Sequence, residues 1–457
     1  MKLTCFDVYE FIKKTNLALL IYTLDMKTLQ TLTIVLLTTN SFSQSMYFPP
    51  ASGNTWDTLS PQSLGWCQQK IDAMYDYLEN NNSKAFILLK DGKIVLEKYF
   101  GSFDQNSTWY WASAGKTITS FMTGIAQQEG HLSITDTTAH YLGQGWTDCT
   151  SEQEEKITVR HQLTMTSGLD DGVPDNFCTL DTCLIYKADA GDRWAYHNGP
   201  YTLLDGVIEN ATGVSLNSYT TQKLKNPTGM TGMFYSVDYN NVFFSTARSM
   251  ARFGLLILNQ GNWNGNQLMT DQAYFDQMVT PSQSINNSYG YLWWLNGQSS
   301  FMMPGTQIVF PGSLTPAAPA DMIAALGMNG QFIDIIPSEN IVWIRMGEAP
   351  NGGLVPYLLH NEIWDYLNDL ACEPLGFNNI SYEEIAISPN PAIDFISIQS
   401  LNTIRTVTIY NSNGQVVLEK ESLQNNQIDI KSLDRGIYFI HIKSINDINT
   451  IQKLVKY

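Results

Sequence analysis

The sequence predicts an α+β fold: an antiparallel sheet flanked by helices, with a helical subdomain, followed by a small C-terminal β-sandwich. Two patterns indicate this fold class. Apolar runs of strand length lie at residues 84–101 and 331–347 with helical patterns between them, so strands from both ends must complete one sheet. Near residue 380 the chain changes to short runs of alternating apolar and polar residues, which is typical of a β-sandwich.

Local signals place the individual elements. The Asp91-Gly92 pair between two apolar runs predicts a β-hairpin, and Gly130 marks the end of a helix that starts near Ser113. A second hairpin is expected around a turn at residues 338–340. Apolar residues at helical spacing predict helices over residues 64–78, 113–128, 159–166, 200–209, 247–259 and 355–370.

Length and composition bound the domain organisation. A chain of 457 residues exceeds what one hydrophobic core usually organises, and its 44% hydrophobic and 15% charged residues exclude a disordered protein. The net charge of −17 makes nucleic acid and anionic membrane surfaces unsuitable partners. We expect an N-terminal extension with a signal peptide at 1–44, a catalytic domain at 45–379 and a C-terminal domain at 380–457.

The N-terminal segment has the pattern of a secretory signal peptide. Met26 and Lys27 precede an apolar run that ends in small and polar residues at Ser43 and Gln44. On this interpretation Met26 is the true start of translation, and residues 1–25 come from an upstream start codon. The alternative is a membrane anchor over residues 17–37, which the charged residues near its centre make costly. We therefore expect a secreted or cell-surface protein without a permanent membrane span.

The six cysteines fit an oxidising compartment. Cys178 and Cys183 are close enough in sequence to close a small loop. Cys67 and Cys372 lie on the first and last helical patterns of the middle region, and would form a second bridge if those helices pack together. Cys149 is left over. None of the spacings resembles a zinc site, so no metal or cofactor is expected.

The stretch WASAGKTITS holds the first candidate catalytic residues. Ser113 and Lys116 are separated by three positions at the start of a predicted helix, so both lie on one helix face. A buried lysine with a lowered pKa can activate a serine hydroxyl, and the start of a helix offers a backbone N–H to an oxyanion. The alternative is a helix-capping serine beside a solvated lysine.

A second candidate element is the Tyr196-His197-Asn198 loop before an amphipathic helix. A phenol near an ammonium group can carry a proton, and the Asn198 amide can hold a substrate carbonyl. The same Y-x-N spacing occurs at Tyr239 and Tyr366, so order and flanking residues must decide. Trp109 and Trp111 are candidates for a cleft wall, and core packing is their alternative role.

The flanks of these elements carry a family resemblance. Residues 84–370 resemble the serine β-lactamase and penicillin-binding-protein superfamily, most closely the class C-like esterases, D-aminopeptidases and 6-aminohexanoate-oligomer hydrolases. The resemblance implies that Ser113 is the acylated nucleophile, Lys116 its partner, Tyr196 the second proton carrier and Asn198 a substrate-binding residue. The matching landmarks are residues 111–130, 157–169, 193–219, 245–261 and 288–294.

The same resemblance implies a third element before the final hairpin, usually K-T-G or H-x-G. Met328-Asn329-Gly330 is the candidate, with the Gln331 N–H as the second oxyanion donor. Met328 stands where a lysine or histidine is usual, which favours ester or neutral-amide hydrolysis of a small molecule or peptide. The alternatives are a β-lactamase or DD-peptidase, and a non-catalytic surface protein. The sequence contains no G-x-S-x-G elbow.

The C-terminal region resembles a second family. The sequences SPNP at 388–391, TIYNSNGQVV at 408–417, LDRGIYFIHI at 433–442 and KLVKY at 453–457 match in order the type A sorting domain of the type IX secretion system. This resemblance implies export across an outer membrane by that machinery. The alternative is a β-sandwich binding module, for example for carbohydrate.

Overall fold

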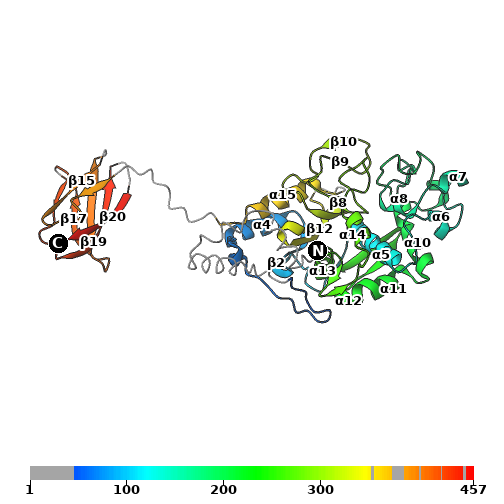
Figure 1. The fold of residues 1–457 in the computed structure, drawn as a ribbon, viewed down its shortest axis with the longest axis horizontal. Coiled ribbons are helices and arrows are strands. Elements are labelled where there is room, and N and C mark those ends of the chain that lie inside the picture. Colours follow the sequence, from blue (N-terminus) through cyan, green and yellow to red (C-terminus); the bar gives the residue numbers. More distant parts are fainter. Residues whose placement is uncertain are drawn as a thin grey trace, which may run out of the picture. The chain divides into compact units, whose positions relative to one another are not determined.

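The computed structural model describes residues 46–350, 355–372, 385–400, 403–421, 423, 425–445 and 449–457. The chain divides into two compact units between Ala371 and Cys372 (Figure 1). The predicted signal peptide and the predicted boundary at residues 379–380 lie outside the described residues.

The first unit is organised around a six-stranded sheet with strand order β2-β1-β13-β12-β11-β8, in which each neighbouring pair is antiparallel. Strands from the beginning and the end of the unit therefore complete one sheet, as predicted. The strands are β1 (Ser83–Lys90), β2 (Lys93–Tyr99), β8 (Trp294–Leu295), β11 (Ile323–Gly327), β12 (Gln331–Ile336) and β13 (Ile341–Gly347).

Both predicted hairpins are present, and their turns use left-handed backbone. Asp91 and Gly92 have φ values of 51° and 80°, and Asn340 in the second turn has φ of 51°. At Gly92 an added Cβ would lie 1.9 Å from the Tyr47 carbonyl oxygen, so only glycine fits.

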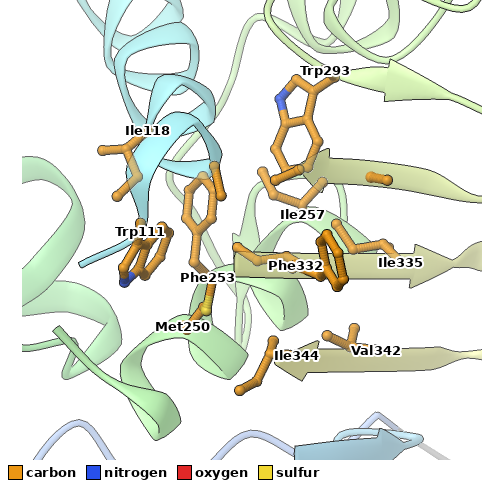
Figure 2. Close-up of a cluster of buried hydrophobic side chains, with 14 of the residues drawn as sticks. Trp111, Ile118, Met250, Phe253, Ile257, Trp293, Phe332, Ile335, Val342 and Ile344 are labelled. Atoms are coloured by element: carbon orange, nitrogen blue, oxygen red, sulfur yellow. The ribbon is translucent and has the colours of Figure 1, made fainter. Parts of the chain in front are cut away.

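Helices cover both faces of the sheet. Helix α13 (Ala247–Leu258) packs so closely that a Cβ on Gly254 would lie 2.5 Å from Val342, and its Phe253 joins the apolar cluster of Figure 2. Successive side chains of a strand point to opposite faces of the sheet, so Asp334 points away from α13. Helix α15 (Tyr357–Asn368) covers this second face. There the Asp334 carboxylate accepts hydrogen bonds from His360 and Trp364, at 2.8 and 2.7 Å.

The middle of the unit is the predicted helical subdomain. Helix α5 is its central element, and its residues from Lys116 to Ala126 are all buried. The helices of the subdomain are α5 (Lys116–Gln128), α6 (Thr138–Leu142), α7 (Ser151–Glu154), α8 (Val159–Leu163), α9 (Asn198–Thr202), α10 (Leu204–Thr212), α11 (Leu216–Thr220), α12 (Asn226–Thr228) and α14 (Gln272–Met278). Helix α4 (Gln68–Asn80) precedes β1 and packs against α15 instead.

Three small sheets, which the sequence patterns did not predict, complete the first unit. One has the order β3-β5-β4, and the other two are the pairs β6–β7 and β9–β10. The strands are β3 (Thr108–Tyr110), β4 (Met233–Val237), β5 (Asn240–Thr246), β6 (Asn262–Trp263), β7 (Asn266–Gln267), β9 (Ser300–Met302) and β10 (Val309–Pro311).

The second unit consists of two antiparallel sheets around its own apolar core, as expected for a small β-sandwich. The sheets have the orders β14-β15-β18 and β17-β16-β19-β20. Their strands are β14 (Ala386–Ser388), β15 (Phe395–Gln399), β16 (Ile404–Tyr410), β17 (Val416–Glu421), β18 (Gln427–Asp429), β19 (Gly436–Ser444) and β20 (Asn449–Lys456).

Four of the described cysteines are disulfide-bonded. Cys178 and Cys183 form a disulfide, and Cys149 is free. Cys67 and Cys372 are both disulfide-bonded, and the Cys67 N–H donates to the Leu370 carbonyl at 2.9 Å. Within the described part of the chain there is no cluster of residues suited to a metal ion, and no helix long and apolar enough to cross a membrane.

Candidate active site

Ser113 lies on a short 3₁₀ turn, Ala112–Gly115, that leads directly into α5. Ala112 has a φ of 47°, a left-handed conformation that a non-glycine residue adopts only under constraint from its surroundings. The constraint comes from Trp111, which is fully buried, donates through Nε1 to Ser245 Oγ at 2.8 Å and accepts at its carbonyl from the Ala114 N–H. The core thus holds the backbone around Ser113 in a fixed, strained turn.

Lys116 is the immediate partner of Ser113. Its Nζ donates a hydrogen bond to Ser113 Oγ at 3.2 Å. The lysine is only 4% exposed, and this burial lowers its pKa to about 7, against the opposing effect of the Asp205 carboxylate. A substantial neutral fraction of Lys116 therefore exists at neutral pH, which is what a proton acceptor requires.

Two tyrosines enclose the Lys116 ammonium group. Nζ lies 4.1 Å from the ring centroid of Tyr201 and 5.4 Å from that of Tyr196, within the range of cation–π contacts. Burial raises the pKa of the Tyr196 phenol, and a side-chain hydrogen bond with Ser113 opposes this shift. Tyr196 is therefore a neutral phenol at neutral pH, in contact with the same hydroxyl as Lys116.

Asp205 on α10 interacts electrostatically with the Lys116 ammonium group. The sequence analysis did not predict a role for it. Burial raises its pKa to about 7, although its Oδ2 accepts a hydrogen bond from Asn241 Nδ2 at 3.0 Å. Thr119 on α5 donates to its other oxygen at 3.5 Å. The available signal was a single acid inside the apolar run of residues 203–208, on a helix that packs against α5.

A cavity of about 390 Å³ opens at Ser113. Of the predicted residues, Ser113, Tyr196, Asn198 and Met328 line it. The rest of the lining was missed because loops far apart in the sequence supply it, and it is mainly apolar: Asp171, Asn176, Phe177, Trp294, Met303, Pro304, Gly305, Leu326, Val355 and Tyr357. Among the described residues, the lining contains no lysine or arginine, and its one carboxylate, Asp171, is paired with Arg193.

Neither tryptophan proposed for the cleft wall lines the cavity. Trp111 is wholly enclosed by the core, where its ring packs against Phe243 and Phe253. Trp109 is half-buried, lies under the Lys84 ammonium and donates to the Gly347 carbonyl at 3.3 Å. Core packing, the alternative considered for both, describes their positions.

The predicted third element also requires a correction. Met328, Asn329 and Gly330 form a tight turn between β11 and β12, and only Met328 faces the cavity. Gln331 is fully buried in β12, where its amide donates to the Met328 and Gly347 carbonyls and accepts from the Gly347 N–H. Asn329 donates instead to the Tyr110 hydroxyl at 2.7 Å.

The β11 edge approaches the Ser113 turn at Gly327. A Cβ at Gly327 would lie 2.5 Å from the Trp111 carbonyl oxygen and 3.0 Å from the Ala114 nitrogen. The buried guanidinium of Arg345 holds the following turn by donating to the Asn329 and Gly330 carbonyls, at 3.2 and 2.7 Å. A serine on a helix start thus faces a fixed strand edge, an arrangement suited to acyl transfer.

The family assignments agree with this fold. Residues 79–352 match the Beta-lactamase family model, and because this is more than half of the sequence, the chain belongs to the beta-lactamase family. Residues 386–457 match the Secretion system C-terminal sorting domain. That domain indicates a secreted or cell-surface protein.

Among curated proteins, the chain is similar to Protein flp of Staphylococcus aureus (strain MRSA252), with 26% identity over 196 residues, which is 38% of this chain and 39% of that protein. The chain therefore spans about two fifths of the length of the curated relatives it matches.

Solved structures share the fold. One is a putative 6-aminohexanoate-dimer hydrolase from Bacillus anthracis, with a TM-score of 0.53 and 19% identity, covering 72% of this chain and 92% of that one. Another is a putative beta-lactamase from Bacteroides dorei DSM 17855, with a TM-score of 0.53 and 16% identity, covering 67% of this chain and 99% of that one.

Proposed function

We propose that the protein is an exported serine hydrolase that forms an acyl-enzyme on Ser113 and cleaves an ester or amide bond of a small, uncharged molecule or peptide. The observation that carries this proposal is the contact between Lys116 Nζ and Ser113 Oγ at 3.2 Å in a buried setting. A solvated lysine beside a capping serine, the alternative, would be exposed and fully charged.

The pKa shifts favour a division of labour between the two proton carriers. Burial lowers the pKa of Lys116 and raises that of Tyr196, so at neutral pH the lysine can accept a proton and the phenol can give one. Ser113 Oγ bonds to the carbonyl carbon while its proton passes to Lys116. Tyr196 protonates the departing alcohol or amine and is reprotonated from Lys116, and water then hydrolyses the acyl-enzyme.

The charge that develops on the carbonyl oxygen requires two backbone donors. We assign these to the N–H groups of Ser113 and Met328, because Gly327 brings the start of this turn within contact of the Ser113 turn. Met328 takes the place of Gln331 in this role, since Met328 lines the cavity and Gln331 does not.

The cavity lining supports an uncharged substrate. A substrate carboxylate would meet Asp171 and a surface built largely of Phe177, Trp294, Met303, Leu326 and similar side chains, without a cation in the described lining. β-Lactams and DD-peptides carry a carboxylate, so these alternative substrates fit the cavity less well than neutral esters or amides.

A fluorophosphonate probe tests the proposal. The probe forms a bond between phosphorus and Ser113 Oγ with loss of fluoride, so we expect labelling of the purified protein and complete loss of labelling in Ser113→Ala. Ser102→Ala, at an exposed position on the same unit, serves as the matched control and should label like the wild type. Labelling that survives Ser113→Ala, or a folded wild type that does not label, would sink the proposal. Nitrocefin turnover, measured in parallel, would restore the β-lactamase alternative.

A further inference from the structure

Two loops outside the predicted motifs supply part of the apolar lining of the cavity. Phe177 lies in the first loop, and Met303, Pro304 and Gly305 lie in the second, which joins β9 and β10. The Phe177 and Met303 side chains are only half-buried, and they line the same cavity as Ser113. A molecule that occupies the site can therefore contact both side chains.

The hydrogen bonds of Asn176 fix the first loop to the segment that carries Tyr196. Its Nδ2 donates to the backbone carbonyls of Asp171 and Tyr196, at 3.2 and 3.4 Å. Its Oδ1 accepts from the backbone N–H of Asn198 at 3.1 Å. Because Phe177 is the next residue, these bonds also fix where its backbone lies beside the cavity.

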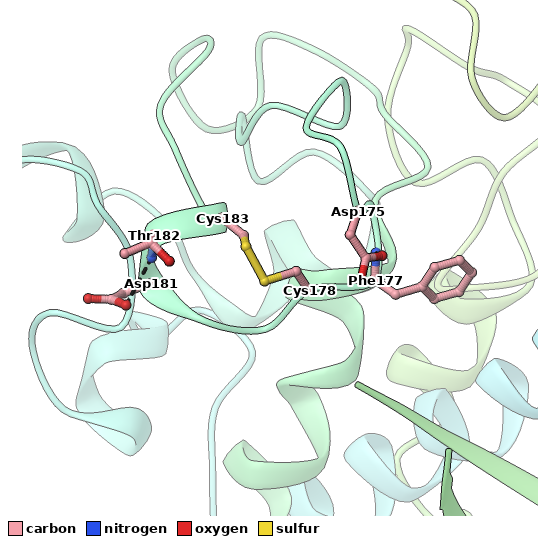
Figure 3. The surroundings of a disulfide bond; sticks show 6 residues. All are labelled: Asp175, Phe177, Cys178, Asp181, Thr182 and Cys183. Atoms are coloured by element: carbon pink, nitrogen blue, oxygen red, sulfur yellow. Dashed lines mark hydrogen bonds between the residues drawn. A yellow bond between two sulfur atoms is a disulfide. The ribbon is translucent and has the colours of Figure 1, made fainter. Parts of the chain in front are cut away.

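A disulfide closes this loop directly after Phe177. The bond joins Cys178 to Cys183, and Figure 3 shows the Phe177 ring directed away from it. The loop lies against the start of α9, since a Cβ on Gly199 would be 2.4 Å from the Cys178 carbonyl oxygen. The cross-link and this close packing hold the wall in place before a ligand arrives, which reduces the entropy lost on binding.

The second loop is tied to the same segment. Gln307 Nε2 donates to the Trp194 carbonyl at 3.1 Å. Trp294, which also lines the cavity, stacks nearly parallel to Tyr196, with the ring centroids 6.0 Å apart. The apolar surfaces of both loops therefore have a fixed position relative to Tyr196, the proposed proton donor.

The polar side chains of the described lining are largely engaged with the protein. Asp171 pairs with Arg193, and Asn198 Nδ2 donates to Asn176 Oδ1 at 2.6 Å. A substrate group that extends away from Ser113 therefore meets mainly carbon, and an apolar group gains most from displacing water there. The cavity volume of about 390 Å³ is within the range of sites that enclose small organic molecules.

We propose that Phe177 and Met303 form an apolar subsite that binds an alkyl chain of the substrate, and that these two residues determine specificity. This inference rests on the proposed function and narrows its substrate class to esters or amides with a hydrophobic chain on one side of the reacting bond. A chain of the same length that contains an ether oxygen loses part of the gain, because that oxygen gives up its hydration against carbon.

Symmetric probes test the subsite. Dimethyl, dibutyl and bis(2-methoxyethyl) fluorophosphate carry the same chain on both oxygens, so one chain reaches the subsite on whichever side of the reacting centre it lies. In each reaction Ser113 Oγ bonds to phosphorus, its proton passes to Lys116 and fluoride leaves. Each labelling rate constant of the full-length protein is divided by the rate constant of the same probe with hydroxide, which removes differences in intrinsic reactivity.

We expect the dibutyl probe to label the wild type about tenfold or more faster than either of the other two probes. The butyl and 2-methoxyethyl chains have equal length and differ only in a methylene against an ether oxygen. The ratio of their rates therefore reports apolar contact, whereas the comparison with the dimethyl probe reports the room available to a chain.

Variants assign this preference to the two residues. Phe177→Ala and Met303→Ala should each lower the ratio of dibutyl to bis(2-methoxyethyl) rates by about threefold or more. Leu180→Ala is the matched control, because Leu180 belongs to the same disulfide-closed loop, is 52% exposed and does not line the cavity. It should keep the wild-type ratio. A ratio of rates is unaffected by partial loss of folded protein, since only folded molecules label.

Four results would overturn the inference: equal rates for the butyl and 2-methoxyethyl probes, a dibutyl probe slower than the dimethyl probe, a ratio that survives Phe177→Ala, or a ratio that Leu180→Ala lowers equally. Labelling that is lost in Ser113→Ala but shows no chain preference contradicts only this inference. A folded wild type that none of the probes labels contradicts the proposed function.

Discussion

The pKa of Lys116, and hence its charge at neutral pH, is set mainly by the side chains around it. Tyr196 and Tyr201 exclude water from the ammonium group, and Asp205 is the carboxylate whose charge counteracts this effect. The two ionisable side chains also affect one another, since the Lys116 charge lowers the pKa of Asp205. Lys116 and Asp205 therefore titrate as a coupled pair, and the dependence of the reaction rate on pH will reflect the ionisation of both groups.

This arrangement predicts the pH dependence of Ser113 reactivity. The pKa of Lys116 is lowered to about 7, so the neutral, proton-accepting form grows as pH rises through 7. We expect the rate of fluorophosphonate labelling to rise about tenfold between pH 6 and pH 8. A lysine at its ordinary pKa would instead give a rate that still rises steeply above pH 9.

The Asp205→Asn variant should move this profile. A negative Asp205 stabilises the Lys116 ammonium and raises its pKa, so removal of that charge should shift the midpoint to lower pH. The labelling rate is measured across the same pH range, with Asp276→Asn, at an exposed position, as the matched control. A midpoint that stays in place or moves upward would show that Asp205 does not act on Lys116.

Some single residues of the site were visible in the sequence and others were not. Ser113 and Lys116 were predicted because their spacing places them on one helix face, a local property. Asn176 and Phe177 were missed because their place in the cavity depends on a loop that folds onto α9. Trp111 was misassigned as a wall candidate, since an aromatic residue beside a motif looks the same whether it faces the core or the cleft.

At the scale of elements, the contact between β11 and the Ser113 turn joins the two halves of the site. Gly327 makes this contact possible, because its lack of a side chain lets the strand approach the Trp111 carbonyl. Arg345 fixes the turn that follows β11 through its hydrogen bonds to backbone carbonyls. The distance between the two proposed oxyanion donors, the N–H groups of Ser113 and Met328, thus depends on packing between backbones.

The Gly327→Ala variant tests this dependence. The added Cβ would lie 2.5 Å from the Trp111 oxygen, so the strand must move away from Ser113. We expect labelling to slow by more than about tenfold. Gly436→Ala is the matched control, because its added Cβ meets only Tyr438 at 3.8 Å and Gly436 lies in the second unit. A labelling rate equal to that of the wild type would contradict the role of this contact.

The elements that sequence patterns predicted are those with strong local signals. Turn chemistry predicted the hairpin at Asp91-Gly92, and it is present. Apolar spacing predicted a helix over residues 247–259, and its bounds agree to within one residue. The sheet β3-β5-β4 was missed because β3 is three residues long and pairs with a strand far away in the sequence. Short strands that depend on distant partners leave little trace in local patterns.

At the scale of the whole molecule, the two units have separate hydrophobic cores. We therefore predict that residues 45–379, expressed alone, fold and label with fluorophosphonate at the rate of the full chain. The midpoint of their thermal unfolding should match that of the first unit in the full chain to about 2 °C. Calorimetry of both proteins checks this, and loss of labelling in the shorter protein would show that the second unit supports the site.

The closing of the sheet by strands from both ends has a consequence for the timing of activity. Ser113 and its turn are synthesised early, whereas β11 and the Met328 turn come near the end of the first unit. A chain that is still emerging from a ribosome, or is held unfolded for export, carries Ser113 without the Met328 turn that the proposed mechanism requires. If both act as proposed, activity begins only when the first unit has folded completely, and the esters and amides of the producing cell are spared.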